Sequence, residues 1–201
     1  MRLIRRNRGQ ELAAAIERGR TLIREQKDGE ALEFLEKAIQ DFPESPEMPL
    51  MLATAYRGFR PDDVPSLLAK AAKLGSDDPV IQVMVGHRRL NEGDVEAART
   101  CAARAEELID DRFALTADLD RLVGRIAARD GEYDFAEEKL RSAVQLEPES
   151  STHSLGLARF LWARGRNEDA VRVIEESLPQ ISGKKDLLER LRSEIAAELP
   201  S

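Results

Sequence analysis

Cysteine, histidine and aromatic residues are scarce in this sequence. Among 201 residues there is one cysteine, Cys101, which excludes an intramolecular disulfide and is typical of a reducing compartment. Aromatic residues make up only 4% of the chain, which argues against strands. The two histidines, His87 and His153, lie far apart, and no HxxxH, HExxH or CxxC spacing occurs, so the sequence indicates no metal site.

Long apolar runs are also missing. No stretch approaches the roughly 18 apolar residues of a membrane span, so we expect no membrane insertion. The first ten residues, MRLIRRNRGQ, are basic but lead into no apolar segment, which argues against a secretory signal and predicts a cytoplasmic location. We expect residues 1–10 to form a solvated, frayed extension, although their arginines also suit anionic lipid or nucleic acid.

Signatures of catalysis are absent as well. The sequence contains no GxGxxG or Walker-type phosphate loop and no GxSxG nucleophile motif. Acidic pairs such as Glu106-Glu107 and Glu137-Glu138 belong to the polar faces of predicted helices. We therefore expect a protein that is not an enzyme and that needs no cofactor.

Residues Ala117–Pro148 carry the clearest pattern that is present. Apolar residues recur there at helical spacing on either side of a central turn, at Leu122, Val123, Ile126, Ala127, Tyr133, Phe135, Ala136, Leu140, Ala143, Val144 and Leu146. Asp130-Gly131 interrupts the pattern where a tight turn needs a residue that adopts positive φ, and Pro148 ends it. Gly124, Ala136 and Ala143 are small, as two closely packed helices require. The stretch predicts a helical hairpin.

This hairpin resembles the tetratricopeptide repeat, a helix–turn–helix unit of about 34 residues. Six residues match its consensus: Gly124, Gly131, Tyr133, Ala136, Ala143 and Pro148. Four residues depart from it, because Asp120, Val123, Ala127 and Leu140 stand where the family prefers Trp, Leu, Tyr and Phe. The resemblance implies an all-α, right-handed solenoid.

Imperfect copies of the hairpin cover most of the chain. We expect five repeats within residues 11–183, at about 11–43, 46–77, 79–110, 117–148 and 151–182. Residues 184–201 should form a capping helix with one apolar face, made of Leu187, Leu188, Leu191, Ile195 and Leu199. The expected total is eleven helices.

Two places break the regular spacing. In the second repeat, Leu52 stands where the helix glycine would be, and Pro61 and Pro65 should delay the second helix. Ala105 and Ala143 are 38 positions apart (143 − 105), about four more than one repeat. We expect a lengthened helix or a wider loop around Leu108–Leu115.

Function should lie on a surface, and the resemblance implies which one. In the family, the first helices of successive hairpins line a concave groove that holds extended peptides or partner helices. The second hairpin, for example, would present Pro46, Pro49, Ala53, Tyr56 and Arg57. The residues that we expect to bind a partner are Arg20, Arg24, Tyr56, Arg57, His87, Asn91, Arg121, Arg125, Arg129, Arg159 and Trp162.

The groove-facing places carry an excess of positive charge. They include seven arginines and one acidic residue, Asp118, hence 7 − 1 = +6, whereas the whole chain carries −7. The remainder therefore carries −7 − 6 = −13, and such asymmetry favours an acidic peptide or protein as partner.

Three hypotheses follow. The first is an adaptor or scaffold that binds an acidic segment in the basic groove. The second is an assembly module that forms homo-oligomers. The third, RNA or another polyanion in the same groove, is disfavoured because few aromatic residues are available for base stacking. On a blander interpretation, the arginines pair with acidic residues of neighbouring repeats and Trp162 packs against the cap.

Overall fold

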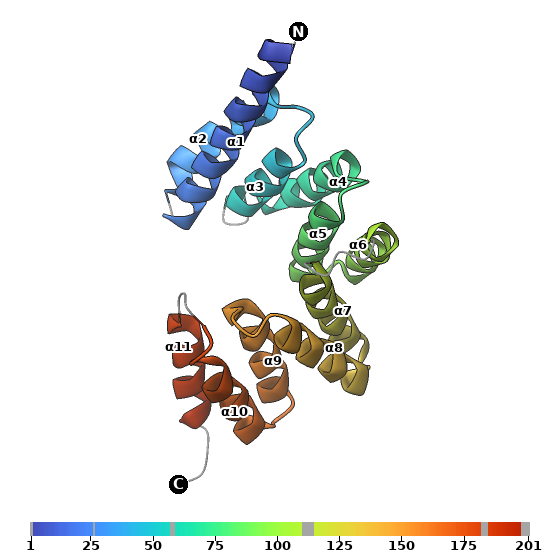
Figure 1. The fold of residues 1–201 in the computed structure, drawn as a ribbon, viewed down its shortest axis with the longest axis vertical. Coiled ribbons are helices and arrows are strands. Elements are labelled where there is room, and N and C mark those ends of the chain that lie inside the picture. The colour runs from blue at the N-terminus through green and yellow to red at the C-terminus, as the bar shows by residue number, and fades with distance from the viewer. Residues whose placement is uncertain (1, 26, 57–58, 110–114, 182–184, 198–201) are drawn as a thin grey trace. The chain divides into compact units, whose positions relative to one another are not determined.

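The computed structural model describes residues 2–25, 27–56, 59–109, 115–181 and 185–197. These residues form eleven α-helices and one short 3-10 helix, and no strand occurs among them (Figure 1). The all-α prediction is therefore confirmed. The chain divides into two compact units, Met1–Ala97 and Ala98–Ser201, with the boundary inside one helix.

The N-terminal unit is a succession of helices that pack one against the next. It contains α1 (Arg2–Arg24), α2 (Asp28–Asp41), α3 (Glu47–Tyr56), η1 (Pro61–Asp63), α4 (Val64–Leu74), α5 (Pro79–Asn91) and the start of α6 (Val95–Leu108). Each helix from α1 to α5 packs against the next, and α1 also packs against α3 (Figure 1). Leu35, Met48 and Leu68 are among the fully buried side chains of this unit.

The first helix is longer than expected. It begins at Arg2 rather than near Glu11, so residues 2–10 continue α1 instead of fraying. Arg8 anchors this part, since its guanidinium lies 3.2 Å from a carboxylate oxygen of Glu44 and donates to the carbonyl of Asp41 at 3.4 Å. The side chains before Arg8 lie outside the described residues.

The second hairpin departs from the predicted register. Pro49, Ala53 and Tyr56, which we expected to face the concave groove, are buried. Leu50 and Thr54 instead line a surface hollow. A shift of one residue along a helix turns the side chain by about 100°. A shift of this size explains why Leu50 and Thr54 lie at the hollow in place of Pro49 and Ala53. Ala53, one residue after Leu52, is then the small buried residue of α3.

The two prolines of this hairpin act as predicted. Pro61 opens η1, and α4 begins only at Val64, with Pro65 in its first turn. Proline is tolerated there because the first amides of a helix have no partner within it.

The C-terminal unit repeats the hairpin more regularly. After the end of α6 it contains α7 (Thr116–Asp130), α8 (Tyr133–Leu146), α9 (Ser151–Ala163), α10 (Asn167–Ser177) and α11 (Asp186–Ala196). Helices α7 and α8 form the most extensive pair among the described helices, and α9 packs against α7, α8 and α10 (Figure 1). Leu140, Leu161, Ile174 and Ile195 belong to its apolar core.

Glycines have the two roles that the sequence predicts. Gly131 ends α7 with φ 84°, and Gly93 and Gly165 take φ values of 85° and 73° in the corresponding turns. Gly124 lies where α7 meets α8, and a Cβ there would stand 2.9 Å from Cγ of Leu140 and 3.0 Å from the carbonyl oxygen of Ala136. Only glycine allows this approach of the two helices.

The additional residues after the third hairpin lie between helices. Helix α6 ends at Leu108 and α7 begins at Thr116, while α6 and α8 both have 14 residues, so α6 is not lengthened. Residues 110–114 lie outside the described residues.

The terminal helix packs on α9 and α10, as a capping helix should. Leu188, Leu191 and Ile195 are buried, but Leu187 is 60% exposed, so its assignment to the apolar face was wrong. Leu199 lies outside the described residues.

Candidate functional site

The predicted site residues belong to the first helices of the hairpins. In the N-terminal unit these are Arg20 on α1, Tyr56 on α3, and His87 and Asn91 on α5. In the C-terminal unit they are Arg121, Arg125 and Arg129 on α7, and Arg159 and Trp162 on α9. Arg57 and the side chain of Arg24 lie outside the described residues.

Four of these residues come together in the C-terminal unit. Arg121, Arg125 and Arg129 are spaced four apart and therefore share one face of α7, and Arg159 stands on the adjacent α9. We call these four residues the arginine cluster. On α9, Gly156 faces the stem of Arg121, because a Cβ at that position would lie 3.8 Å from Cδ of Arg121.

The charges of the arginine cluster act on one another. The pKa of Arg125 is lowered to about 10, first because the side chain is largely buried and then because Arg121, Arg129 and Arg159 repel its positive charge. Neighbouring positive charges and partial loss of water both disfavour a charged guanidinium. The folded chain therefore holds this cluster at an electrostatic cost.

Three arginines of the cluster, Arg121, Arg129 and Arg159, have few partners among the described residues. Arg121, with 14% of its side chain exposed, donates from Nη2 to Oδ1 of Asp118 at 3.1 Å, but its Nε is buried and has no acceptor. Arg129 and Arg159 are exposed and form no ion pair with any carboxylate in the described part of the chain. An incoming anion would therefore meet guanidinium groups with unused donors.

Trp162 lies on α9, one turn beyond Arg159. It is half-buried and packs against the apolar core of the C-terminal unit. The packing role considered from the sequence is therefore present, and part of the ring remains exposed.

The N-terminal residues have different surroundings. Arg20 is exposed and pairs with Glu17 on its own helix at 2.9 Å. Tyr56 is buried, and its hydroxyl donates to Oε1 of Glu36 at 2.6 Å and accepts from Arg60 at 3.0 Å. The hydrogen bond to Glu36 raises the pKa of Tyr56. Tyr56 thus belongs to the packing between α2 and α3.

Sequence reasoning missed one feature of the N-terminal unit. A hollow of about 220 Å³ opens between α1, α3 and α5. We call it the apolar hollow, and its lining residues are Arg20, Ile23, Glu47, Leu50, Met51, Thr54, Met84 and Arg88. Met84 and Arg88 were not selected, although their spacing of four on α5 could have indicated a shared face.

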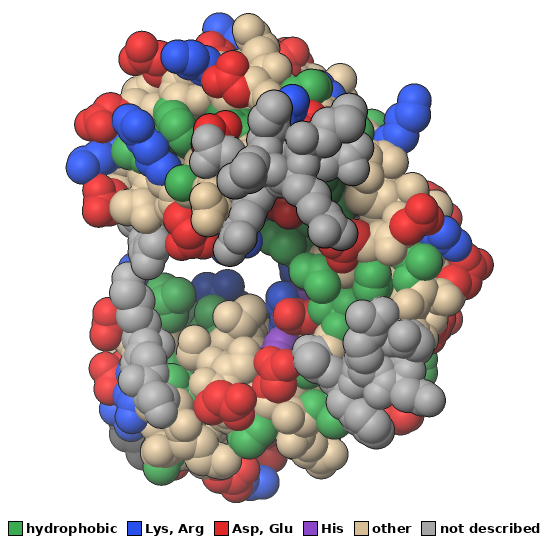
Figure 2. Space-filling view, turned by 45° about the horizontal axis from the view of Figure 1, so that its top comes forward, with side chains coloured by type: hydrophobic (Ala, Val, Ile, Leu, Met, Phe, Trp, Pro, Cys, Tyr) green, Lys and Arg blue, Asp and Glu red, His purple; other side chains and the backbone are tan. Residues whose placement is uncertain are grey.

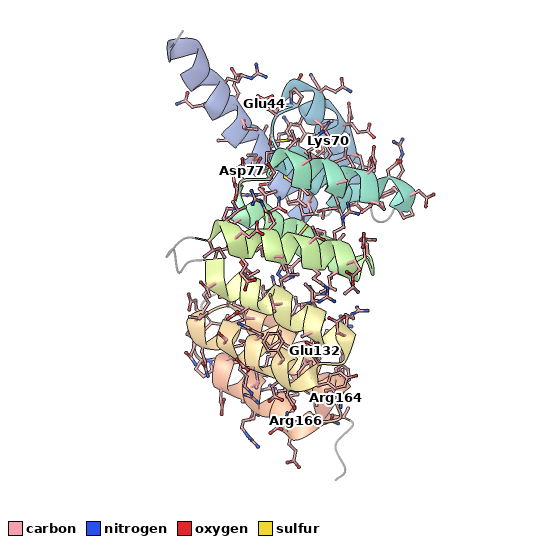
Figure 3. All side chains as sticks on the ribbon, turned by 90° about the vertical axis from the view of Figure 1, so that its right-hand side faces the viewer. Glu44, Lys70, Asp77, Glu132, Arg164 and Arg166 are labelled. Carbon is pink, nitrogen blue, oxygen red and sulfur yellow. The ribbon has the colours of Figure 1, made fainter. Side chains whose placement is uncertain are left out.

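Other arginines of the C-terminal unit have clear partners. Arg166 forms ion pairs with Glu137 on α8 and with Asp169 on α10, and Arg164 stacks over the ring of Tyr133 with its guanidinium carbon 3.7 Å from the ring centre. Figure 3 shows Arg164 and Arg166 beside Glu132, at the turn ends of these hairpins. Figure 2 likewise shows acidic and basic side chains interspersed over the visible face. The arginine cluster differs from these sites, because Arg129 and Arg159 have no carboxylate partner among the described residues.

Neither a metal site nor a membrane-spanning helix occurs in the described part of the chain. Within the described ranges, no three His, Cys, Asp or Glu residues are grouped so that they could hold a metal ion. None of the described helices combines the length and apolar character that crossing a bilayer requires.

Comparisons with known proteins agree with this architecture. Residues 127–193 match the family model described as tetratricopeptide repeat, and proteins with this repeat are typically non-catalytic. No curated protein sequence matches the chain.

Three solved structures illustrate the likeness of fold. TTC0263, a thermophilic TPR protein of Thermus thermophilus, is 21% identical with a TM-score of 0.73, over 92% of this chain and 99% of that one. Pseudomonas aeruginosa PilF is 17% identical with a TM-score of 0.68, over 95% and 89%. Yeast Tom70 is 21% identical with a TM-score of 0.64, over 92% of this chain but only 39% of its own.

At sequence identities of 17–21%, the solved structures show the fold alone. The family model concerns the sequence of residues 127–193. Over most of its length the chain has the fold of tetratricopeptide-repeat solenoids, and residues 127–193 match the sequence model of the tetratricopeptide-repeat family.

Proposed function

We propose that this protein is a non-catalytic interaction module that binds an acidic segment of another protein on the first helices of its C-terminal unit. Repeat proteins of this family generally serve as protein–protein interaction scaffolds. The observation that carries the proposal is the arginine cluster on α7 and α9, in which burial and the three neighbouring guanidinium groups lower the pKa of Arg125.

The cluster suits carboxylates for a physical reason. Four like charges repel one another, and an anion that approaches them relieves this repulsion while it gains charge-assisted hydrogen bonds. The planar fork of arginine also matches a carboxylate in two-pronged geometry. The exposed ends of Arg129 and Arg159 offer donors for such bonds.

A nucleic-acid partner is less well supported. The chain carries a net charge of −7 and only 4% aromatic residues, so it offers little general attraction for phosphate backbones and little stacking surface. A short acidic peptide needs only the local positive field of the cluster.

The test is an affinity purification from lysate with the wild type and with an Arg121/Arg125/Arg129→Glu variant, followed by mass spectrometry. The matched control is Arg104/Arg172/Arg190→Glu, which changes the net charge equally at exposed positions outside the cluster. Circular dichroism should show all three proteins folded.

We expect acidic partners to be lost from the cluster variant and kept by the control. If all three proteins recover the same partners, the cluster is not the binding surface. Self-association is the second candidate function, and a mass that rises with concentration in light scattering, together with no specific partner, would favour it.

A further inference from the structure

The arginine cluster carries more positive charge than one carboxylate balances. The helices that hold it contain three acidic residues, all of them on α7 and none on α9. Asp120 and Asp130 pair with basic residues outside the cluster, at 3.0 Å and 2.9 Å. Of the three, only Asp118 pairs within the cluster, with Arg121 at 3.1 Å. The four arginines and Asp118 therefore carry 4 − 1 = +3.

The donors of the cluster come from two helices. Arg121, Arg125 and Arg129 follow one another along one face of α7, with a rise of about 6 Å between neighbours. Arg159 stands on α9, which packs against α7. Burial, and then the charges of neighbours that include Arg129 and Arg159, lower the pKa of Arg125 to about 10, so both neighbours lie close to it. Arg129 and Arg159 are exposed and have no carboxylate partner among the described residues, so their donors are open to a ligand.

A phosphate monoester matches donors of this kind better than a carboxylate does. The two oxygens of a carboxylate lie in one plane and suit the fork of a single guanidinium. A phosphate monoester has three acceptor oxygens in a tetrahedral arrangement and a charge of about −1.5 to −2 at pH 7. It can therefore accept hydrogen bonds from guanidinium groups on two helices at once, and it offsets more of the local positive charge.

From these features we propose that the arginine cluster binds a phosphate group on the partner's acidic segment, carried by a phosphoserine or a phosphothreonine. Binding of an acidic segment, as proposed above, is the premise, and the phosphate group specifies the anion. Phosphorylation of the partner then switches binding on, because an unmodified hydroxyl offers neither the charge nor the three acceptor oxygens.

The test uses three fluorescein-labelled peptides of one short acidic sequence, with phosphoserine, glutamate or serine at the central position. Fluorescence anisotropy gives the dissociation constant of each peptide with the full chain. We expect the phosphoserine peptide to bind about tenfold more tightly than the glutamate peptide, because it adds both charge and acceptor oxygens. The serine peptide should bind most weakly.

The pH dependence of binding separates a phosphate from a partner that is merely acidic. The second pKa of a phosphate ester is about 6, whereas a glutamate side chain titrates near about 4.3. Between about pH 7.5 and about pH 5.5 the phosphoserine peptide should lose affinity several-fold, while the glutamate peptide should keep its own. The arginines stay charged over this range, because even the lowered pKa of Arg125 is about 10. The glutamate peptide also controls for any titration of the protein itself.

A single substitution tests whether the second helix takes part. Arg159→Gln removes the donor on α9, and we expect it to weaken the phosphoserine peptide about tenfold and the glutamate peptide less. The matched control is Arg172→Gln, which removes the same charge at an exposed position of α10, where the arginine pairs with Asp169 at 3.2 Å. The control should leave binding of both peptides unchanged, and circular dichroism should show both variants folded.

Three results would overturn the proposal. Equal affinities for the phosphoserine and glutamate peptides, both lost in Arg121/Arg125/Arg129→Glu, would reject the phosphate and leave the proposed function standing. Inorganic phosphate that binds as tightly as the phosphoserine peptide would assign the cluster to free phosphate. Absence of binding by all three peptides would also reject the phosphate group. The proposed function itself fails only if the cluster variant keeps its partners in the lysate purification, so the two failures are distinguishable.

Discussion

The first helices of the N-terminal unit carry an apolar hollow and an Arg20 that is paired with Glu17, whereas those of the C-terminal unit carry four arginines that repel one another. Both units are built from the same type of helical hairpin. The difference therefore comes from which side chains lie on the exposed faces of the first helices. A repeat architecture fixes which positions face outward and leaves their chemistry to vary from one hairpin to the next.

The supporting contacts differ too. Gly19 in the N-terminal unit faces the ends of Leu35 and Met51, which are flexible side chains. Gly124 in the C-terminal unit faces Cγ of Leu140 and the backbone carbonyl of Ala136, which yields less readily. Helix α7, which carries three of the four clustered arginines, therefore packs through a contact at Gly124 that yields less than the contact at Gly19.

Gly124→Ala should lower the free energy of unfolding most. The added methyl would stand 2.9 Å from Leu140 and 3.0 Å from a backbone oxygen, and overpacking of this kind costs about 1–3 kcal/mol. Gly19→Ala should change stability by less than about 0.5 kcal/mol, because its neighbours can move and alanine favours a helix. Urea unfolding followed by circular dichroism compares the two variants. Equal losses would contradict this view of the two contacts.

Tyr56→Phe should have an intermediate effect. It removes the hydroxyl that links α3 to Glu36 on α2, at a cost of about 1 kcal/mol. Thermal unfolding measures this loss. A variant as stable as the wild type would show that the hydroxyl does not hold α3 to α2.

Arg125→Gln should change the free energy of unfolding least, and it should raise this free energy instead of lowering it. Below pH 10 the arginine is charged in the folded and unfolded states alike, and the folded state disfavours that charge, so the variant should be slightly more stable than the wild type. As the pH rises through about 10, the folded wild type loses the charge and the difference should shrink. Thermal unfolding of both proteins at neutral and alkaline pH tests this sign. A variant that is less stable at neutral pH would show that Arg125 is well compensated in the folded state.

The sequence alone determined the hairpins, because their signals are local. A glycine that must adopt positive φ, small residues at helix contacts and apolar residues at helical spacing each act within one or two helices. Gly93, Gly131 and Gly165 lie in turns with positive φ, and Gly124 lies at the contact of α7 with α8. The grouping of Arg121, Arg125 and Arg129 also followed from spacing on one helix.

The tertiary structure decided what depends on neighbouring helices. A turn of one residue in α3 buried Tyr56 and Ala53 and brought Leu50 and Thr54 to the hollow, and the degenerate second repeat offered no consensus residue to set that register. Met84 and Arg88 joined the hollow through the placement of α5 against α4, and Leu187 lies exposed on α11. The pKa of Arg125 likewise reflects its burial and a charge on another helix. Burial and electrostatics are properties of the assembled helices, so a pattern along one chain segment predicts the elements but not the surfaces they form together.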